Sequence, residues 1–357
     1  MGKKIFVLIF CIAIVAALDT ANAEVPAVFI LGDSTADTGT NNFLSGSIFK
    51  ANFLPYGIDF PHSRPTGRFS NGFNSADFLA KFLGFKRSPL PFFLVNNIKG
   101  VKRPSFRGVN FASAGSGILN ITGQPPNATQ NVISLAEQID QFSSIYSELV
   151  ANKGEACAQT FLSKSLFFIS VGSNDLFAYF LSNTSVPNKQ EFIDSLGLAY
   201  DGYLRNLYKL GARKFGIISV PTIGCCPSMR ILNFTGGCLG DLNTLATDFY
   251  TAISVVLVKL SSEYKDIKYS LGDTYEMTIN VIDNPSLSGF TNVKDPCCED
   301  ENKSCSPNAN FCSDRRQYLF WDLYHPTQKA SWLAAVTLFT GDARFVTPIN
   351  IKQLAEA

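Results

Sequence analysis

The sequence is poor in histidine, and its charges nearly cancel. His62 and His325 are the only two histidines among 357 residues, and 30 basic residues stand against 29 acidic ones. The chain contains no run of like charges, no low-complexity tract and no internal repeat. Nucleic acids and anionic membranes attract proteins that present a strongly basic face. The near-zero net charge therefore argues against both as partners.

Long hydrophobic runs are scarce as well. Residues 5–18 form an apolar run of 14 residues, preceded by Lys3 and Lys4 and followed by the small residues Ala21 and Ala23. This pattern is typical of a cleaved secretory signal peptide, and the run is too short to span a bilayer. We predict a signal peptide at residues 1–23 and a single domain at residues 24–357. No later stretch is long and apolar enough to predict a membrane-spanning helix, so we expect no stable membrane insertion.

The spacing of the cysteines gives no indication of a metal site. Nine cysteines are present, and Cys11 lies in the predicted signal peptide, which leaves an even number. An even number in an exported chain favours disulfides, whereas zinc sites need separated cysteine pairs with histidine support. We therefore expect disulfides of undetermined pairing, no metal and no cofactor. The cysteines of the mature chain are Cys157, Cys225, Cys226, Cys238, Cys297, Cys298, Cys305 and Cys312.

Five Asn-x-Ser/Thr sequons support passage through the secretory pathway. Such sequons accept N-linked glycans on surface loops of exported proteins. One sequon is weak evidence, but five agree with the signal peptide and the even cysteine count. We predict glycosylation at Asn120, Asn127, Asn183, Asn233 and Asn302.

Short apolar runs alternate along the chain with longer amphipathic segments, in which apolar residues such as Leu242, Leu245 and Phe249 recur at helical spacing. Apolar strands separated by helices predict a mainly parallel sheet that is covered by helices on both faces. The expected architecture is a three-layer α/β/α fold. We expect five strands at residues 25–31, 107–112, 165–171, 214–220 and 268–271, and helices at 132–150, 191–210 and 239–260.

Small or polar residues follow the first three predicted strands: Ser34, Gly115 and Asn174. In open α/β sheets, reactive groups gather beyond the carboxyl ends of the strands. A serine hydroxyl can act as a nucleophile, while a backbone amide or an asparagine side chain can donate to an oxyanion. Each residue taken singly also fits an ordinary turn or a helix cap. No serine stands in a Gly-x-Ser-x-Gly motif, which argues against the α/β-hydrolase arrangement.

His325 is the better candidate for a general base. Asp322 lies three residues before it, so the carboxylate can orient the imidazole while the other ring nitrogen faces Ser34. The alternative is a structural or surface histidine. His62 lies in a proline-flanked loop with only Asp59 nearby, and we interpret it as a surface or substrate-groove residue.

Six sequence blocks resemble the plant-type GDSL esterase/lipase family, also called SGNH hydrolases. They occur in the family's order, and the resemblance covers essentially the whole mature chain. The blocks are Phe29-Ile-Leu-Gly-Asp-Ser34, Arg64-Pro-Thr-Gly-Arg-Phe-Ser-Asn-Gly72, Gly108-Val-Asn-Phe-Ala-Ser-Ala-Gly115, Val171-Gly-Ser-Asn174-Asp, Val220-Pro-Thr-Ile-Gly-Cys-Cys-Pro227 and Phe320-Trp-Asp322-Leu-Tyr-His325-Pro-Thr.

The resemblance implies a flavodoxin-like fold and assigns roles to the candidate residues. Ser34 would be the nucleophile, His325 the base and Asp322 the residue that orients the base. The amide of Ser34, together with Gly115 and Asn174, would form the oxyanion hole.

Three positions depart from the family's pattern. Thr35 replaces the leucine of the family name, and His62 replaces a small residue. Ala114 replaces a glycine, which leaves open whether Gly115 or Gly117 supplies the donor.

The expected function is hydrolysis of a small-molecule or lipid ester through a covalent acyl-enzyme, with no cofactor. An acyltransferase that passes the same acyl group to an alcohol, in plant specialised metabolism, is an alternative that the motifs do not separate. A secreted binding or defence protein without catalysis is a further alternative. We expect an extracellular, apoplastic protein; a vacuolar one is compatible with the same signals, and the sequence does not predict an oligomeric state.

Overall fold

The computed structural model describes residues 25–97, 99–103, 105–124, 132–182 and 188–357. The predicted signal peptide and the sequons at Asn127 and Asn183 lie outside these residues. Among the other sequons, Asn120 and Asn302 are exposed and Asn233 is partly exposed, with its side-chain amide donating to the carbonyl oxygen of Cys238.

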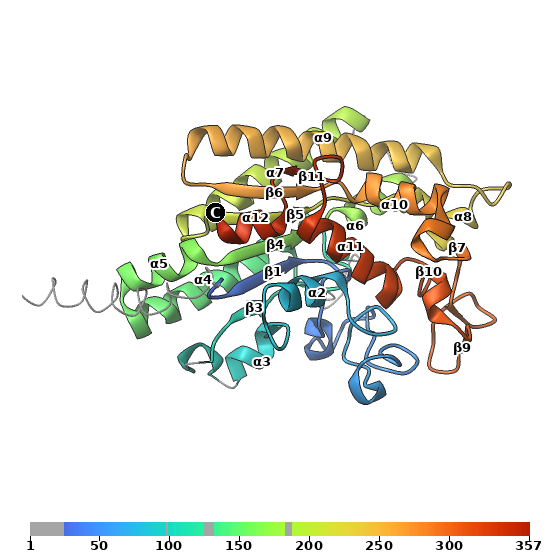
Figure 1. The fold of residues 1–357 in the computed structure, drawn as a ribbon, viewed down its shortest axis with the longest axis horizontal. Helices are drawn as coiled ribbons and strands as arrows, with labels where there is room; N and C mark the ends of the chain where they lie inside the picture. The colour runs from blue at the N-terminus through green and yellow to red at the C-terminus, as the bar shows by residue number, and fades with distance from the viewer. Residues whose placement is uncertain (1–24, 98, 104, 125–131, 183–187) are drawn as a thin grey trace, which may run out of the picture.

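A seven-stranded sheet forms the centre of the fold, with the strand order β11-β6-β5-β4-β1-β3-β2 (Figure 1). All neighbouring strands are parallel except β11, which runs antiparallel to β6. The prediction of a mainly parallel sheet is confirmed, but the predicted number of five strands is wrong. The two missed strands, β2 and β11, lie at the edges and are too short to produce an apolar run. The strands are β1 (Val28–Gly32), β2 (Leu90–Pro91), β3 (Gly108–Asn110), β4 (Leu166–Ser170), β5 (Lys214–Ile218), β6 (Lys268–Gly272) and β11 (Val346–Pro348).

Helices cover both faces of this sheet. Because side chains alternate along a strand, Phe29 and Phe167 face one layer of helices, while Ile30 and Phe168 face the other. The first core contains residues of α4 (Leu135–Lys153), α5 (Glu155–Lys164), α6 (Ser173–Leu181), α7 (Lys189–Lys209) and α9 (Gly240–Glu263). The second contains residues of α2 (Ser75–Phe82), α10 (Thr274–Asp283), α11 (Gln328–Thr340) and α12 (Ile351–Glu356). The described residues also form two short helices, α3 (Phe92–Asn97) and α8 (Pro227–Arg230), and the α/β/α prediction is confirmed.

Helix α4 illustrates how the sequence determines an element. Ser134 and Glu137 form a reciprocal capping box at its start, and Gly154 follows its last residue. Between them, one face that includes Ile139 and Phe142 is buried in the first core. The predicted helices at 132–150, 191–210 and 239–260 correspond to α4, α7 and α9, with ends shifted by up to three residues.

Among the described residues, one helix, α9, is long and apolar enough to cross a membrane. The expectation that no stretch after the signal peptide would meet this criterion is therefore wrong. Its buried face, which includes Leu242, Phe249 and Leu257, packs in the first core, and the helix contacts α7. A helix that covers one face of a sheet has the same length and composition, so α9 gives only weak evidence for membrane insertion.

A disulfide-bonded segment, residues 292–320, lies beside the carboxyl ends of the parallel strands (Figure 1). We refer to it as the disulfide module. It contains β7 (Asn292–Pro296), β8 (Cys298–Glu299), β9 (Asn310–Phe311) and β10 (Tyr318–Phe320). Disulfides join Cys297 to Cys312 and Cys298 to Cys305.

A further disulfide joins Cys225 to Cys238, whereas the neighbouring Cys226 is a free, buried thiol. The prediction of disulfides is therefore confirmed, and their pairing, which the sequence left open, does not include Cys226. Burial raises the pKa of the Cys226 thiol to about 12, so the thiolate is disfavoured at neutral pH.

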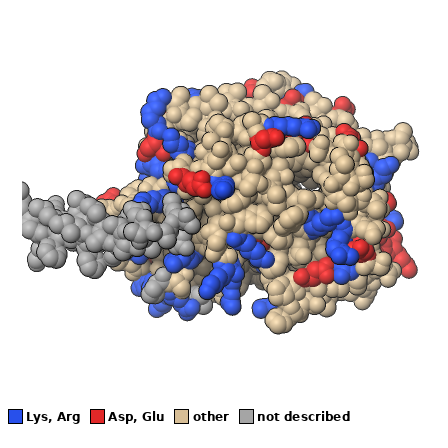
Figure 2. All heavy atoms as spheres, viewed as in Figure 1, with Lys and Arg blue, Asp and Glu red and all other residues tan. Residues whose placement is uncertain are grey.

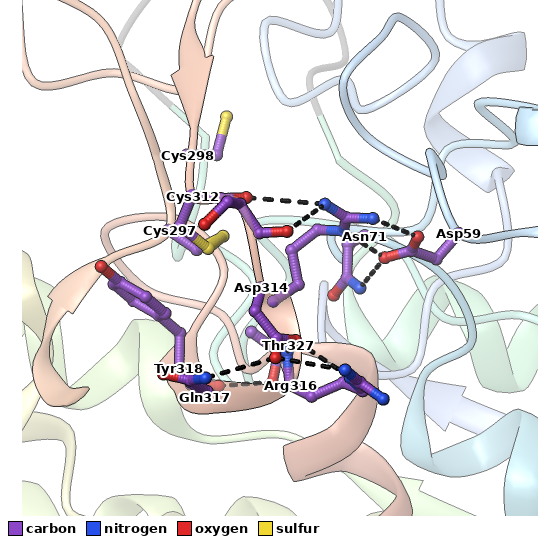
Figure 3. Close-up of a disulfide and its surroundings, with 12 residues drawn as sticks. Asp59, Asn71, Cys297, Cys298, Cys312, Asp314, Arg316, Gln317, Tyr318 and Thr327 are labelled. Carbon is purple, nitrogen blue, oxygen red and sulfur yellow. Dashed lines mark hydrogen bonds and ion pairs between the residues drawn. A yellow bond between two sulfur atoms is a disulfide. The ribbon is translucent and has the colours of Figure 1, made fainter. Parts of the chain in front are cut away.

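An ion pair attaches the segment 44–72 to the disulfide module. The guanidinium of Arg315 lies 2.6 and 2.8 Å from the two carboxylate oxygens of Asp59, and the side-chain amide of Asn71 donates to the same carboxylate at 2.6 Å. Figure 3 shows Asp59 and Asn71 beside the module. The segment is thus tied to a part of the chain 256 residues away.

Acidic and basic side chains are interspersed over the face of the molecule in view in Figure 2, between large uncharged areas. The ion pairs on such surfaces contribute little, because water screens them.

The pair between Arg68 and Asp77 differs from these surface ion pairs. Asp77 is fully buried and Arg68 is only 8% exposed, and the two side chains meet through two contacts of 2.7 Å.

We expect Arg68→Met to lower the free energy of unfolding by about 3–5 kcal/mol, because it leaves a buried carboxylate without its partner. Burial acts to raise the pKa of Asp77, but the charge and hydrogen bonds of Arg68 lower it by a larger amount, so the net shift is downward. The pair therefore stabilises the fold at neutral pH, and this contribution is lost as the pH falls through the lowered pKa. Urea unfolding at pH 7 measures the loss.

Arg344→Met provides the matched control, since Arg344 pairs with Glu276 at an exposed site. It should change the free energy of unfolding by less than about 1 kcal/mol. Equal effects of the two substitutions would contradict a special role for the buried pair.

Candidate active site

The order of the central strands brings three separate segments together. Strand β1 pairs with β3 on one side and with β4 on the other. Ser34 follows β1, Gly115 lies in the turn after β3, and Asn174 lies in the first turn of α6, directly after β4. All three therefore meet at the same edge of the sheet, and all three line one cavity.

His325 and Asp322 reach this edge from the connection between β10 and α11. The Nε2 atom of His325 lies 2.7 Å from the hydroxyl oxygen of Ser34, and its Nδ1 atom lies 2.8 Å from Oδ2 and 2.9 Å from Oδ1 of Asp322. The backbone amides of Tyr324 and His325 donate to the Asp322 carboxylate, each at 2.8 Å. The arrangement can take a proton from the hydroxyl of Ser34 and stabilise the imidazolium that results.

The Asp322 carboxylate is suited to remain ionised beside an imidazolium. It is 4% exposed, and burial acts to raise its pKa. The charge of His325, the hydrogen bond with its ring and the two backbone donors outweigh burial and lower the pKa.

Several hydrogen-bond donors belong to Ser34 itself or to residues that line the same cavity. Within the part of the chain that the structure describes, the backbone amides of Ser34 and Gly115 donate to no protein acceptor. The side-chain amide of Asn174 donates to the carbonyl oxygen of Ser116 at 2.8 Å. This bond fixes the orientation of the amide and leaves its second N–H hydrogen available to another acceptor. These groups can donate to an oxygen that acquires negative charge near Ser34.

Of the two glycines that the sequence left open, Gly115 lies at the cavity. Its φ angle is +85°, which side chains rarely allow, and a side chain there would collide with Phe49 and Val132. Gly117 packs against Thr122 and Asp175 and does not line the cavity. The geometry therefore favours Gly115 as the donor.

Three buried polar side chains hold these donors in place, and the sequence did not reveal them. The side chain of Gln138 bonds to the backbone N–H and carbonyl of Gly32 and to the hydroxyl of Ser116. Asp37 accepts from the amides of Gly39, Thr40 and Ala114. Asp175 accepts from the amides of Ile118 and Leu119 and from the hydroxyl of Thr122. Burial raises the pKa of both carboxyls to about 6 against the effect of these donors.

Two aromatic residues next to His325 and Asp322 were also missed. The ring of Phe69 lies 4.8 Å from the imidazole of His325, and the hydroxyl of Tyr56 donates to Oδ2 of Asp322 at 2.8 Å. Phe69 stands in the second of the six sequence blocks, which could have indicated it. Tyr56 lies outside every block that we identified, and no spacing rule connects it to Asp322.

The cavity around Ser34 has a volume of about 750 Å³. Its wall is rich in apolar side chains, from the segment 48–56, α6, β5, α10 and α11. Phe49, Phe53, Phe177, Val281, Phe290 and Leu338 are among them.

His62 is exposed and does not line the cavity, so the structure favours a surface residue over a substrate contact. Among the described residues, no group of three or more His, Cys, Asp or Glu side chains could hold a metal ion.

Thr35, the departure from the family's leucine, takes part in a polar link. Its hydroxyl donates to Oδ1 of Asp33 at 2.7 Å and lies 2.9 Å from the hydroxyl oxygen of Ser170. The backbone amide of Thr35 donates to the same oxygen of Asp33. Burial raises the pKa of Asp33, and both bonds from Thr35 oppose this shift. The link joins the turn that carries Ser34 to the end of β4, which precedes Asn174.

We expect Thr35→Val to slow the labelling of Ser34 by a fluorophosphonate probe about two- to tenfold, the range expected for the loss of a single hydrogen bond. Valine keeps the shape but not the hydroxyl, whereas Thr35→Ser keeps the hydroxyl and should retain the rate. Mass spectrometry of the adduct over time gives both rates. A slow Ser variant beside a normal Val variant would show that the methyl group, not the hydroxyl, matters.

Known proteins resemble this chain over most of its length. The sequence model of the GDSL-like Lipase/Acylhydrolase family matches residues 28–335. GDSL esterase/lipase At5g55050 of Arabidopsis thaliana is 38% identical over 343 residues, which cover 93% of this chain and 90% of that protein. GDSL esterase/lipase At1g71691 of the same plant is 36% identical over 351 residues, which cover 95% and 88%. GDSL esterase/lipase LTL1, also from this plant, is 33% identical over 336 residues, which cover 91% and 90%. The chain therefore belongs to the GDSL-like lipase/acylhydrolase family of carboxylic ester hydrolases.

Proposed function

We propose that the protein cleaves carboxylic esters through a covalent acyl-enzyme on Ser34. The observation that carries the proposal is the hydrogen-bonded chain from Ser34 through His325 to Asp322 at the wall of an apolar cavity. A serine hydroxyl is a weak nucleophile until an adjacent base takes its proton. In this chain His325 is at hydrogen-bond distance from the hydroxyl, and Asp322 holds its ring.

The reaction proceeds in two steps. The oxygen of Ser34 attacks the ester carbonyl as His325 takes the hydroxyl proton, and His325 then gives this proton to the alcohol that leaves. Water attacks the acyl group on Ser34 in the second step as His325 takes a proton from it. His325 then gives this proton to the oxygen of Ser34 as the ester bond to Ser34 breaks and the acid is released. Asp322 stays ionised throughout and stabilises the imidazolium.

Negative charge develops on the carbonyl oxygen in both steps. The backbone amides of Ser34 and Gly115 and the side chain of Asn174 donate to this oxygen. These donors are oriented before the substrate binds, by Gln138, Asp37 and Asp175, so little reorganisation is needed during the reaction.

The cavity and the disulfides support a substrate class and a location. A mostly apolar wall of this size accommodates a small-molecule or lipid ester with a hydrocarbon part. Disulfides persist in oxidising compartments, and the signal peptide predicted at residues 1–23 directs export. We therefore infer a secreted enzyme of the apoplast.

We expect a fluorophosphonate probe to label Ser34 of the purified glycoprotein. Ser34→Ala should abolish labelling, and His325→Ala should slow it by a factor of about 10³ or more, as in other enzymes with this arrangement. Peptide mass spectrometry locates the adduct. A folded protein that is not labelled would overturn the proposal and would favour a binding or defence protein without catalysis.

The same acyl-enzyme can transfer its acyl group to an alcohol, and the apolar wall around Ser34 favours this second candidate function. An alcohol bound in such a cavity competes with water at far higher local concentration. With a reactive ester as donor and increasing alcohol, a transferase gives the new ester as the main product at millimolar acceptor. A hydrolase gives free acid at every acceptor concentration. Chromatography of the two products distinguishes them.

A further inference from the structure

Tyr56 occupies a special position relative to Asp322. Among the described residues, it is the only one outside the turn 322–325 that donates a hydrogen bond to the Asp322 side chain. The hydroxyl of Tyr56 lies 2.8 Å from Oδ2, the oxygen that also takes the shorter contact with the His325 ring. The Tyr56 side chain is only 6% exposed, so water does not replace this bond freely.

The surroundings of Tyr56 hold its ring on several sides. Its ring centroid lies 5.3 Å from that of Phe53, 5.8 Å from that of Phe69 and 6.4 Å from that of Trp321, all in edge-on geometry. These rings belong to a small buried cluster that also contains the cysteines of the disulfide module. The disulfide module thus packs against Tyr56. The ion pair between Arg315 and Asp59 fixes the same segment three residues after Tyr56.

The segment that carries Tyr56 also forms part of the substrate cavity. Ile48, Phe49 and Phe53 line this cavity, and Phe69, at the end of the same region, packs on His325. Tyr56 therefore links the wall of the substrate cavity to the Asp322 carboxylate, which orients the base His325.

We propose that Tyr56 is a positioning residue, whose hydroxyl fixes the Asp322 carboxylate and thereby the ring of His325, and which couples both to the wall of the cavity. This inference rests on the proposed ester-cleaving function. The hydroxyl of Tyr56 acts through Asp322, to which it donates, whereas the ring of Tyr56 belongs to the wall of the cavity.

The hydroxyl remains a donor at every working pH. Burial, followed by the charge and the hydrogen bond of Asp322, raises the pKa of Tyr56 well above its ordinary value. The Tyr56 hydroxyl donates to Oδ2 of Asp322, the oxygen whose negative charge also attracts the protonated ring of His325. This hydrogen bond weakens that attraction. Without the hydroxyl, the carboxylate stabilises the imidazolium more strongly, and the base is protonated at higher pH. The carboxylate also loses one of the contacts that determine its orientation.

Tyr56→Phe tests this role against Tyr318→Phe. Tyr318 belongs to the same aromatic and disulfide cluster, but in the described chain its hydroxyl has no hydrogen-bond partner, and only its backbone carbonyl accepts from Thr327 (Figure 3). For Tyr56→Phe, we expect kcat for a reactive ester to fall roughly tenfold, as for loss of a hydrogen bond to a charged group, with little change in KM. The acidic limb of kcat/KM should move to higher pH. Tyr318→Phe should retain the wild-type kcat and pH profile.

A double-mutant cycle separates positioning from simple loss of structure. In an Asp322→Asn background, Tyr56→Phe should cause no further loss of kcat, because the charged carboxylate that the hydroxyl fixes has been removed. Replacement of Tyr56 by 3-fluorotyrosine keeps the ring and strengthens the donor, so it should move the acidic limb to lower pH. This variant retains the packing and serves if Tyr56→Phe does not fold, as judged by thermal unfolding.

Two results would overturn the inference alone: an unchanged pH profile in both Tyr56 variants, or equal losses of kcat from Tyr56→Phe in the wild-type and Asp322→Asn backgrounds. A wild-type protein that cleaves no ester and leaves Ser34 unlabelled would instead overturn the proposed function, and the inference with it.

Discussion

The parallel pairing of β1 with β3 and β4 is the constraint on which the site depends. Because parallel strands end at the same edge, Ser34, Gly115 and Asn174 meet although they are separated by up to 140 residues. Gly32 makes this close pairing possible, since any side chain there would collide with the backbone of Ser170. The connection after β10 then needs to supply only His325 and Asp322, from one turn.

Much of this arrangement could be predicted from the sequence, for identifiable physical reasons. The apolar runs of β1, β4 and β5 are buried on both faces and therefore easy to find, and histidine is so rare that His325 had one competitor. The spacing of Asp322 and His325 is local, so its geometry follows from one turn. The assigned roles of Ser34, His325, Asp322, Gly115 and Asn174 stay predictions until the labelling experiment tests them.

The remainder could not be predicted, because it depends on contacts between distant segments. The bond from Tyr56 to Asp322 spans 266 residues, and that from Gln138 to Gly32 spans 106. Neither leaves a periodic pattern in the sequence. Strands β2 and β11 have two and three residues and form because they meet the edges of an existing sheet. The free thiol of Cys226 beside the paired Cys225 likewise depends on the tertiary structure, which the cysteine count does not reveal.

The buried carboxylates show what the site costs the fold. Burial raises the pKa of Asp33, Asp37 and Asp175, so folding disfavours the charged form of each carboxyl relative to the unfolded chain. A folded state that binds protons more tightly than the unfolded chain loses stability as the pH rises from about 4 to about 6. If these three residues only filled space, apolar side chains at the same positions would make the fold more stable. Their acceptor oxygens instead fix the turns on which the donors near Ser34 lie, so stability is traded for an oriented site.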